Sequence, residues 1–345
     1  MCRWCTTLAV GDEHPKSPLQ STRMGKQGFD KKLEAIAALR SAPDVDQLRK
    51  ALNDRNNFLV SKAAAVAGEV AMQALIPDLA AAFDRFMTDP VKSDPKCWAK
   101  NAITKSLKDM GCDDAALFLR GLKHIQLEPS YGRPEDSAQT LRGTCAMALV
   151  ACPLPRFEIL THLVDALAAD PAKTVRMDAA RAIAQIPGLD SLLLLRLKTF
   201  AGDPDAEVTG QCFMSLLEID PKDYIPFVAN FLTGPDPDVR LEAAAALGEC
   251  HDPQASATLI ENYQTNPSDE VKRAILLTLG ASRQTAAAEF LLSVIAAGRQ
   301  HDAITAIGSL AAGRFRDEYR ERVQVASTAR GDAKLAATFE KEFSK

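Results

Sequence analysis

Apolar residues recur along this chain with the spacing of amphipathic helices, and short polar turns separate the helices. The clearest segment reads VRLEAAAALG from Val239 to Gly248. Its positions 1, 5 and 9 are apolar and fall on one face of a helix. Alanines at positions 5, 6 and 8 let a neighbouring helix approach closely. This segment predicts a helix that packs against others in a close array, and we call it the template.

The template recurs at regular intervals. Its first positions in eight copies are Leu59, Ala99, Leu141, Val175, Val208, Val239, Val271 and Asp302. The later copies are 31 to 34 residues apart, and the first two intervals are 40 and 42 residues. A period of this size is typical of stacked helical repeats.

The ends of these helices carry capping signals. Asp205, Pro237 and Ser268 precede their helices, where such residues satisfy or avoid unpaired backbone N–H groups. Gly248 and Gly280 are predicted to end theirs. A second set of amphipathic segments, such as residues 74–86 and 192–201, lies between the template helices. The pattern predicts an all-α, right-handed α-solenoid of about eight two-helix repeats.

The motif V-R-x-x-A-A-x-A-L-G preceded by D-P-x resembles the HEAT-like repeats of the phycobilisome-lyase type. The resemblance covers about residues 30–313 and is strongest over 170–280. It implies a HEAT-like solenoid. Proteins with similar repeats include chromophore lyases, deoxyhypusine hydroxylase, DNA-alkylation glycosylases and scaffolds, so the fold does not choose a function.

Departures from the period predict the domain boundaries. Residues 1–28 are polar without apolar periodicity and are predicted to be a disordered leader, and residues 29–313 form the solenoid. In residues 314–345, 14 of 32 residues are charged, which predicts a polar helical cap of the same domain. The early repeats contain insertions at 87–96 and 124–138, predicted to be loops at one edge.

Composition and charge narrow the function classes. The formal net charge is −4, which argues against nucleic-acid binding and against an anionic membrane surface. No uncharged apolar run is long enough to span a membrane, and no secretory signal is apparent, so we expect a cytoplasmic protein. Five histidines without a following Glu offer no metal-ligand set, and the Cys2–Cys5 pair lacks a second half-site. We therefore expect no cofactor, no metal and no catalytic residues.

The candidate partner-binding residues lie at positions 3 and 7 of the template, which the apolar core leaves facing the concave side. They are unusually apolar or adaptable and comprise Met147, Met177, Arg181, Met214, Leu241 and Leu277. Two interpretations stay open: these positions form a groove for a partner segment, or the curvature of the solenoid buries them against neighbouring helices. Position 2 is basic in five of eight copies, and Arg142, Arg176 and Arg240 are expected to flank the apolar row. Two interpretations of this basic row stay open. It could bind phosphate or an acidic peptide, or it could pair with carboxylates such as Asp205, Asp238 and Asp269.

Two function hypotheses follow. The first is a non-enzymatic scaffold that binds another protein or peptide on the concave face, with Trp98, His124, Tyr131 and Arg133 as candidate loop contacts. The alternative is a chromophore-lyase-like enzyme or accessory factor, and a second alternative is a binder of an anionic partner through the basic row. A closed pocket with a polar centre near Trp98, His124 and Tyr131 would favour the lyase, and an open groove would favour the scaffold.

Overall fold

The computed structural model describes residues 18–344, and the chain divides into two compact units. Unit 1 holds the described residues up to Cys112 together with Gln126–Ala138. Unit 2 holds Asp113–Ile125 and the chain from Gln139 onward. The two units therefore interleave in sequence near the longest predicted insertion.

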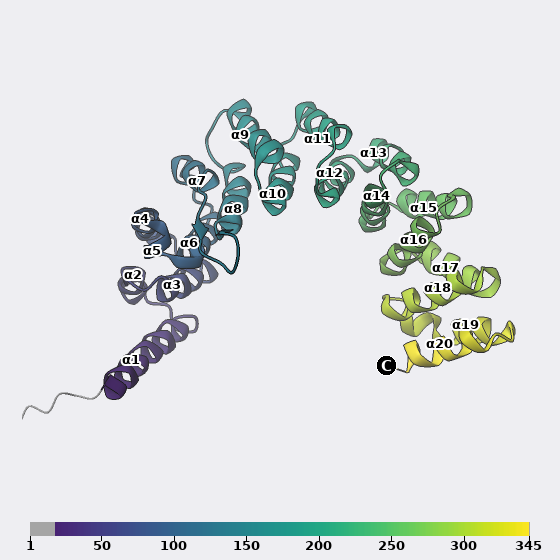
Figure 1. Cartoon of the computed structure of the whole chain (residues 1–345), viewed down its shortest axis with the longest axis horizontal. Helices are drawn as coiled ribbons and strands as arrows, with labels where there is room; N and C mark the ends of the chain where they lie inside the picture. Colours follow the sequence, from purple (N-terminus) through teal and green to yellow (C-terminus); the bar gives the residue numbers. More distant parts are fainter. Residues whose placement is uncertain (1–17, 345) are drawn as a thin grey trace, which may run out of the picture. The chain divides into compact units, whose positions relative to one another are not determined.

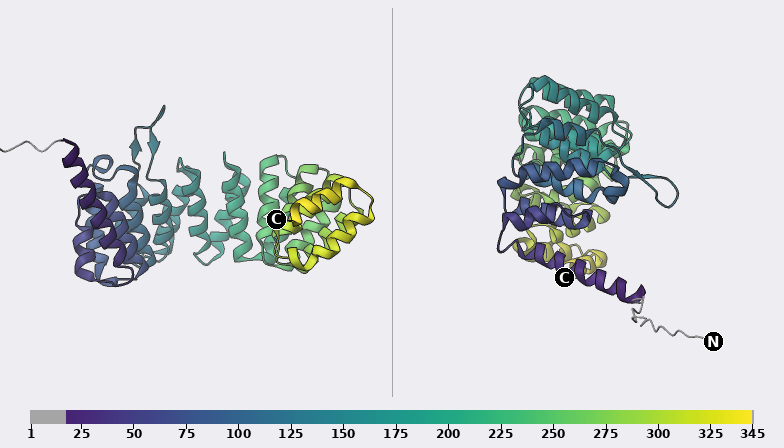
Figure 2. Two further views of the ribbon diagram at one scale, coloured as in Figure 1. Left: turned by 90° about the horizontal axis from the view of Figure 1, so that it is seen from below. Right: turned by 90° about the vertical axis from the view of Figure 1, so that its left-hand side faces the viewer.

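Unit 1 is a small group of helices with one short hairpin. Its elements are α1 (Pro18–Ala38), α2 (Val45–Leu52), α3 (Asn57–Glu69), η1 (Gln73–Leu75), α4 (Ile76–Met87), α5 (Pro90–Ser93), η2 (Pro95–Cys97), α6 (Trp98–Asp109), β1 (Leu127–Glu128) and β2 (Glu135–Asp136). Helix α3 packs on α6, α1 and α2 pack on α3, and α4 packs on α6. The antiparallel hairpin places Leu127 opposite Asp136, and it projects from the helices of this unit (Figure 2).

Unit 2 consists of consecutive helical hairpins. Its elements are α7 (Ala115–Leu122), α8 (Gln139–Leu149), α9 (Arg156–Ala169), α10 (Lys173–Ala184), α11 (Leu189–Ala201), α12 (Ala206–Ile219), α13 (Pro221–Ala229), η3 (Asn230–Thr233), α14 (Pro237–Glu249), α15 (Pro253–Thr265), α16 (Asp269–Ala281), α17 (Thr285–Ala297), α18 (Gln300–Ala312), α19 (Arg316–Ala329) and α20 (Ala333–Phe343). Each even-numbered helix from α8 to α18 packs on the next even-numbered helix. Within unit 2 these helices form the inner layer, and the odd-numbered helices form the outer layer (Figure 1).

The predicted repeat is confirmed helix by helix. All eight template segments lie in helices, namely α3, α6, α8, α10, α12, α14, α16 and α18. Positions 1, 5 and 9 form the core, as Val271, Ile275 and Leu279 of α16 illustrate, because all three are buried. The all-α solenoid of two-helix repeats is therefore the fold of this chain.

The three predicted capping signals differ in outcome: Pro237 begins α14 and Ser268 caps α16, but Asp205 holds the N-cap position of α12 without a side-chain hydrogen bond. Asp236, which is not among the predicted capping residues, caps α14. The Asp236 side chain accepts hydrogen bonds from the backbone N–H groups of Asp238 and Val239 at the start of α14. The Ser268 hydroxyl accepts one from Val271 N–H at the start of α16. The prediction that Gly248 and Gly280 end their helices is wrong, since α14 and α16 each continue one residue further.

Three other boundaries differ from the sequence-based expectation. Helix α1 begins at Pro18, so residues 18–28 are helical rather than a disordered leader, while Cys2 and Cys5 lie outside the described residues. The insertion 87–96 contains the short helix α5 and the start of η2. The insertion 124–138 holds the β1–β2 hairpin, which no strand pattern predicted because each strand has only two residues.

A buried polar cluster anchors both insertions inside unit 1. The Asp94 carboxylate lies 3.1 Å from Lys100 Nζ, and both side chains are fully buried. Asp94 also accepts hydrogen bonds from Ala99 N–H, Lys100 N–H and Asn57 Nδ2, and thus caps the start of α6. Gln126, just before β1, donates from Nε2 to the Asp94 carbonyl. A buried ion pair requires such additional hydrogen bonds, so this cluster has a structural role.

Candidate functional site

The candidate site is the inner face of unit 2, which we define as the accessible surface of its inner-layer helices α8 to α18. The template places positions 3 and 7 on this surface, away from the core positions 1, 5 and 9. Met147, Met177, Met214 and Leu241 are half-buried there, and Leu277 is 51% exposed. These five side chains come from five consecutive inner helices. The structure therefore places the five predicted residues on five consecutive inner helices, where each side chain is at least partly accessible.

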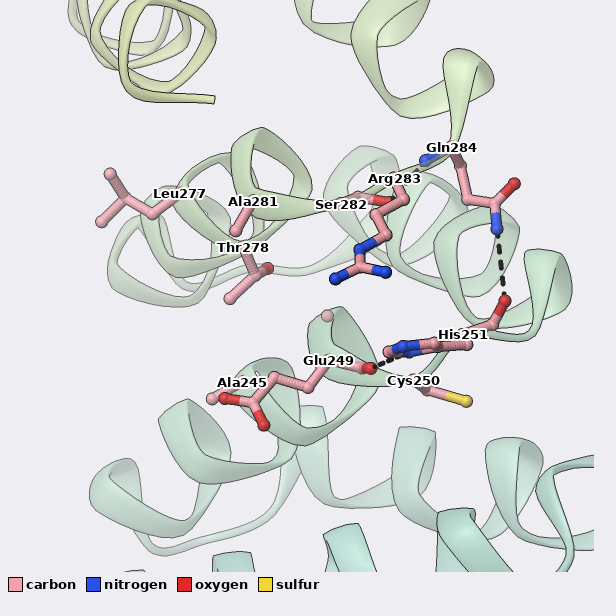
Figure 3. A pocket seen from close by; sticks show the side chains of 11 residues that line it. Ala245, Glu249, Cys250, His251, Leu277, Thr278, Ala281, Ser282, Arg283 and Gln284 are labelled. Atoms are coloured by element: carbon pink, nitrogen blue, oxygen red, sulfur yellow. Dashed lines mark hydrogen bonds between the residues drawn. The ribbon is translucent and has the colours of Figure 1, made fainter. Parts of the chain in front are cut away.

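A groove between α14 and α16 lies at one end of this row. It has a volume of about 570 Å³ and is lined by Ala245, Gly248, Glu249, Cys250, His251, Leu277, Thr278, Ala281, Ser282, Arg283 and Gln284 (Figure 3). Ala245, Leu277 and Ala281 supply apolar surface. The polar side chains of Glu249, His251 and Arg283 come from the ends of the two helices and the turns that follow them.

Hydrogen bonds hold the polar end of the groove in place. The His251 ring has Nδ1 2.9 Å from the Glu249 carbonyl oxygen, which can only accept, so Nδ1–H donates. Gln284 Nε2 donates to the His251 carbonyl at 3.2 Å and joins the two turns (Figure 3). Glu249, His251, Arg283 and Gln284 are not among the site residues predicted from the sequence. Their signal was their place in the turn that follows each template helix.

Carboxylates set the electrostatics of the neighbouring stretch of the inner face. Burial and the nearby Glu207 carboxylate raise the pKa of Glu242, and Asp238 and Glu249 add to the shift. Lys173 opposes it and forms a 2.6 Å ion pair with Glu207. Burial is thus the main cause of the raised pKa of Glu242, and the neighbouring carboxylates add to it.

The basic row is not part of the accessible face. Arg142 is 1% exposed and forms two hydrogen bonds with the Asp170 carboxylate, at 2.7 and 2.9 Å. Arg176 is buried and binds Asp203 at 2.8 Å and Asp205 at 2.7 Å. Each of these arginines pairs with an aspartate from the turn of the following repeat. This corrects the prediction that Arg142 and Arg176 flank the apolar row. Of the carboxylates named for the paired interpretation, Asp205 does pair with Arg176, whereas Asp269 pairs with Arg299, outside the basic row.

The energetics of these pairs agree with a structural role. Burial opposes ionisation of Asp203, but hydrogen bonds from Arg176 and Lys198 outweigh it and hold the pKa of this carboxyl below its usual value. Two cations therefore keep one buried aspartate charged. Removing one partner of such a group costs about 3–5 kcal/mol, because a buried charge is left uncompensated.

The other two predicted arginines differ from each other. Arg181 is exposed on the inner face and forms a 2.8 Å ion pair with Asp178 of the same helix. Arg240 is half-buried, and its Nη1 donates to the Gly234 carbonyl at 3.1 Å. Only Arg181 thus lies where a partner could reach it directly.

The four candidate loop residues are divided between the two units. Trp98 of α6 is exposed, and its ring packs edge-on against Phe58 of α3 with centroids 5.3 Å apart. Tyr131 and Arg133 lie in the exposed loop that joins β1 and β2. His124 belongs to unit 2, where its carbonyl accepts from Arg142 Nη1. None of the four lines the groove between α14 and α16 or the cavity beside α1 in unit 1.

Comparison with known proteins identifies HEAT repeats in part of unit 2. Two overlapping segments, residues 193–280 and 225–312, match the family model described as HEAT repeats. No curated protein matches the sequence. Within the described residues, no helix is both long enough and apolar enough to cross a membrane.

Solved structures resemble the chain in fold alone. The complex of CpcE and CpcF of phycocyanin lyase from Nostoc sp. PCC7120 aligns with 17% identity and a TM-score of 0.33, over 74% of this chain and 91% of that one. The YibA protein of Escherichia coli aligns with 15% identity and a TM-score of 0.37, over 97% and 100%. Human deoxyhypusine hydroxylase in complex with glycerol aligns with 18% identity and a TM-score of 0.28, over 77% and 91%.

Proposed function

Because this chain is built from HEAT repeats, we propose that it is a non-enzymatic scaffold whose unit 2 binds an apolar polypeptide segment along the inner face. One observation carries the proposal. Partly accessible apolar side chains recur at positions 3 or 7 of five consecutive inner helices, and the last of them, Leu277, lines the groove between α14 and α16. Exposed apolar surface of this kind is typical of a protein-binding site.

The residues of the row fit a polypeptide ligand. Met147, Met177 and Met214 have flexible, polarisable side chains that adapt to varied apolar partners. The groove volume of about 570 Å³ falls in the range of pockets that enclose large side chains. A polypeptide ligand would place one apolar side chain in this groove. The rest of the ligand, extended or helical, would then contact the three methionines.

Charges of both signs lie on or beside the inner face. Glu242 and Glu249 are negative, and Glu207 is paired with Lys173. Arg181 is exposed on this face, and Arg283 lines the groove. These charges therefore select neither a basic nor an acidic flank on the partner, and the apolar side chains carry the proposed recognition.

The alternatives have less support. Binding of an anionic partner needs a row of accessible cations, and Lys100, Arg142 and Arg176 are buried beside carboxylates. A lyase-like activity needs an enclosed site with a polar centre, and the described groove is open between two helices. Neither alternative is therefore carried by an observation.

The experiment is a selection of displayed random peptides on the purified full chain. Leu277→Asp should lower the affinity for the selected peptides tenfold or more, because the substitution places a charge where the apolar side chain of the peptide binds. Leu277 is 51% exposed, so the change should leave helicity and melting nearly unchanged.

A matched control is Val325→Asp on α19, an isolated apolar residue that is 62% exposed on the outer layer. This variant should bind the selected peptides like the unaltered chain. Equal peptide affinity in the Leu277→Asp variant and the unaltered chain would overturn the proposal.

A further inference from the structure

Helix α11 of the outer layer is apolar on the side that faces away from the rest of unit 2. Its buried residues Ser191, Leu195 and Thr199 recur every four positions and point inward. On the opposite side, Leu189, Leu193, Leu197 and Phe200 are 64–78% exposed. We call these four residues the α11 stripe. An outer helix of a globular protein normally carries polar residues there, and a helix that is apolar all round is normally buried.

No other described outer helix of unit 2 has such a surface. Exposed large apolar residues occur singly on two of the others, Phe157 on α9 and Val325 on α19. Single exposed apolar residues are ordinary in folded proteins. Four on one line of one helix need a different explanation.

Neighbouring helices contact α11 near both ends of the stripe. At its start, Arg156 of α9 forms an ion pair with Asp190, so the adjoining residues Phe157 and Leu189 lie at the same edge. At its end, the Phe200 ring packs edge-on against Phe227 of α13, with centroids 5.5 Å apart. Phe157, 83% exposed, therefore extends the stripe onto α9.

The size of this surface is that of a protein interface. With about 200 Å² for each fully exposed large side chain, the five residues expose roughly 700 Å². The largest apolar patch on a typical monomer is about 300–600 Å². A stable interface takes about 800 Å² from each partner. The stripe and Phe157 supply nearly all of that from apolar side chains.

The charged residues of α11 are engaged within the chain. Asp190 pairs with Arg156, and Lys198 pairs with Asp203 at 2.8 Å. The Arg196 guanidinium lies 4.3 Å from the centroid of the Phe227 ring. Each of these charged residues of α11 thus already has a contact within the chain. An apolar partner therefore fits the stripe better than a charged one.

The stripe is also nearly symmetric along the helix. Its spacings of 4, 4 and 3 residues read almost the same in both directions about Leu195. When two such helices run antiparallel, Leu193 of one meets Leu197 of the other, and Leu189 meets Phe200. A surface that matches itself under a twofold rotation is what a symmetric dimer requires.

We propose that two copies of this chain associate through antiparallel packing of their α11 stripes. The inner face of unit 2 belongs to the other layer of helices and stays accessible in this dimer. Each dimer then presents two inner faces, and a partner with two binding segments would be held more tightly than by one chain.

The first experiment measures the oligomeric state of the full chain by sedimentation velocity over a concentration series. We expect a dimer, and the double variant Leu193→Asp/Leu197→Asp should raise the dissociation constant on the order of a hundredfold or more. Val325→Asp, equally apolar and 62% exposed but outside the stripe, should dimerise like the unaltered chain. If the aspartates lower the melting temperature, the double variant Leu193→Ala/Leu197→Ala is measured in place of the aspartate variant. Alanine favours the helix and still removes the apolar side chains of the stripe.

The second experiment tests the register. A mixture of Leu193→Cys and Leu197→Cys chains should form disulfide-linked dimers across the two variants faster than either variant alone, with the unaltered chain as background. A chain that stays monomeric at every concentration, or a dimer without this preference for mixed pairs, overturns the proposal. Peptide binding that responds to Leu277→Asp but not to Leu193→Asp/Leu197→Asp keeps this test separate from that of the inner face.

Discussion

Glycines on the inner helices of unit 2 set how closely consecutive repeats approach. A Cβ added to Gly248 of α14 would lie 2.5 Å from Thr278 Cβ of α16, and one added to Gly280 would lie 2.6 Å from Ser309 Cβ of α18. No rotation of the side chain moves a Cβ atom away. These glycines are therefore needed for contact between repeats rather than for ending a helix.

Gly248→Ala should lower the free energy of unfolding by about 1–3 kcal/mol, because the two inner helices must separate. Gly308→Ala is the matched control, since it also lies within an inner helix but has no atom within 4 Å of the added Cβ. That substitution should stabilise the protein by about 0.5–1 kcal/mol through the higher helix propensity of Ala. Urea unfolding measures both, and equal effects of the two substitutions would contradict the packing role.

At the scale of the element, each repeat depends on where its inner helix begins. Asp236 caps α14 with two hydrogen bonds to backbone N–H groups, and Ser268 caps α16 with one. Helix α10 begins differently, because Ala172 occupies its N-cap position and offers no side-chain oxygen. The repeat architecture tolerates this weaker start, since Arg176 of the same helix donates to the Asp170 carbonyl just before it.

Asp236→Ala should cost about 1 kcal/mol of stability, the usual effect of losing an N-cap side chain. Ala172→Ser makes the opposite change, because Ala172 already has the extended backbone of an N-cap residue. It should raise stability by about 0.5–1 kcal/mol. Thermal unfolding followed by circular dichroism checks both, and a Ser variant that melts below the unaltered chain would show that the cap position of α10 lacks room for the hydroxyl.

At the scale of the whole molecule, each repeat is stabilised by its contacts with the neighbouring repeats. In unit 2 the inner helices contact their sequence neighbours in the layer, and α20 covers α18 as α19 covers α17. Phe315, Tyr319, Val323, Phe339 and Phe343 are buried in this last hairpin. Glu289 of α17 accepts hydrogen bonds from Tyr319 and Arg322, which lower its pKa to about 2.

Removal of residues 314–345 should expose the apolar sides of α17 and α18. We expect a lower melting temperature and concentration-dependent aggregation, because solenoids need a terminal repeat with a polar outer surface. Calorimetry and sedimentation of the shortened chain measure these effects. A shortened chain that melts like the full chain and stays disperse would show that the last hairpin is not a cap.

The sequence by itself determined the features that depend on local spacing. The recurrence of V-R-x-x-A-A-x-A-L-G located eight helices, six of them the inner helices of unit 2, and residues such as Ser268 located their starts, because helix period and capping act within a few residues. The same spacing predicted that Met147, Met177, Met214, Leu241 and Leu277 share one face. It also located the polar last hairpin.

Only the tertiary structure decided what depends on residues from other repeats. Arg142 and Arg176 looked like candidates for an accessible row, but aspartates about 30 residues further along the chain draw them into the interior. Residues 192–201 were predicted to be amphipathic, but in α11 the side of Ser191, Leu195 and Thr199 packs inward and Leu193, Leu197 and Phe200 are exposed. Because apolar residues lie around most of this helix, the local pattern does not choose the inward face. The division into two units likewise follows from the way residues 113–138 distribute between them. In each case the deciding energy comes from contacts distant in sequence, which a local pattern does not contain.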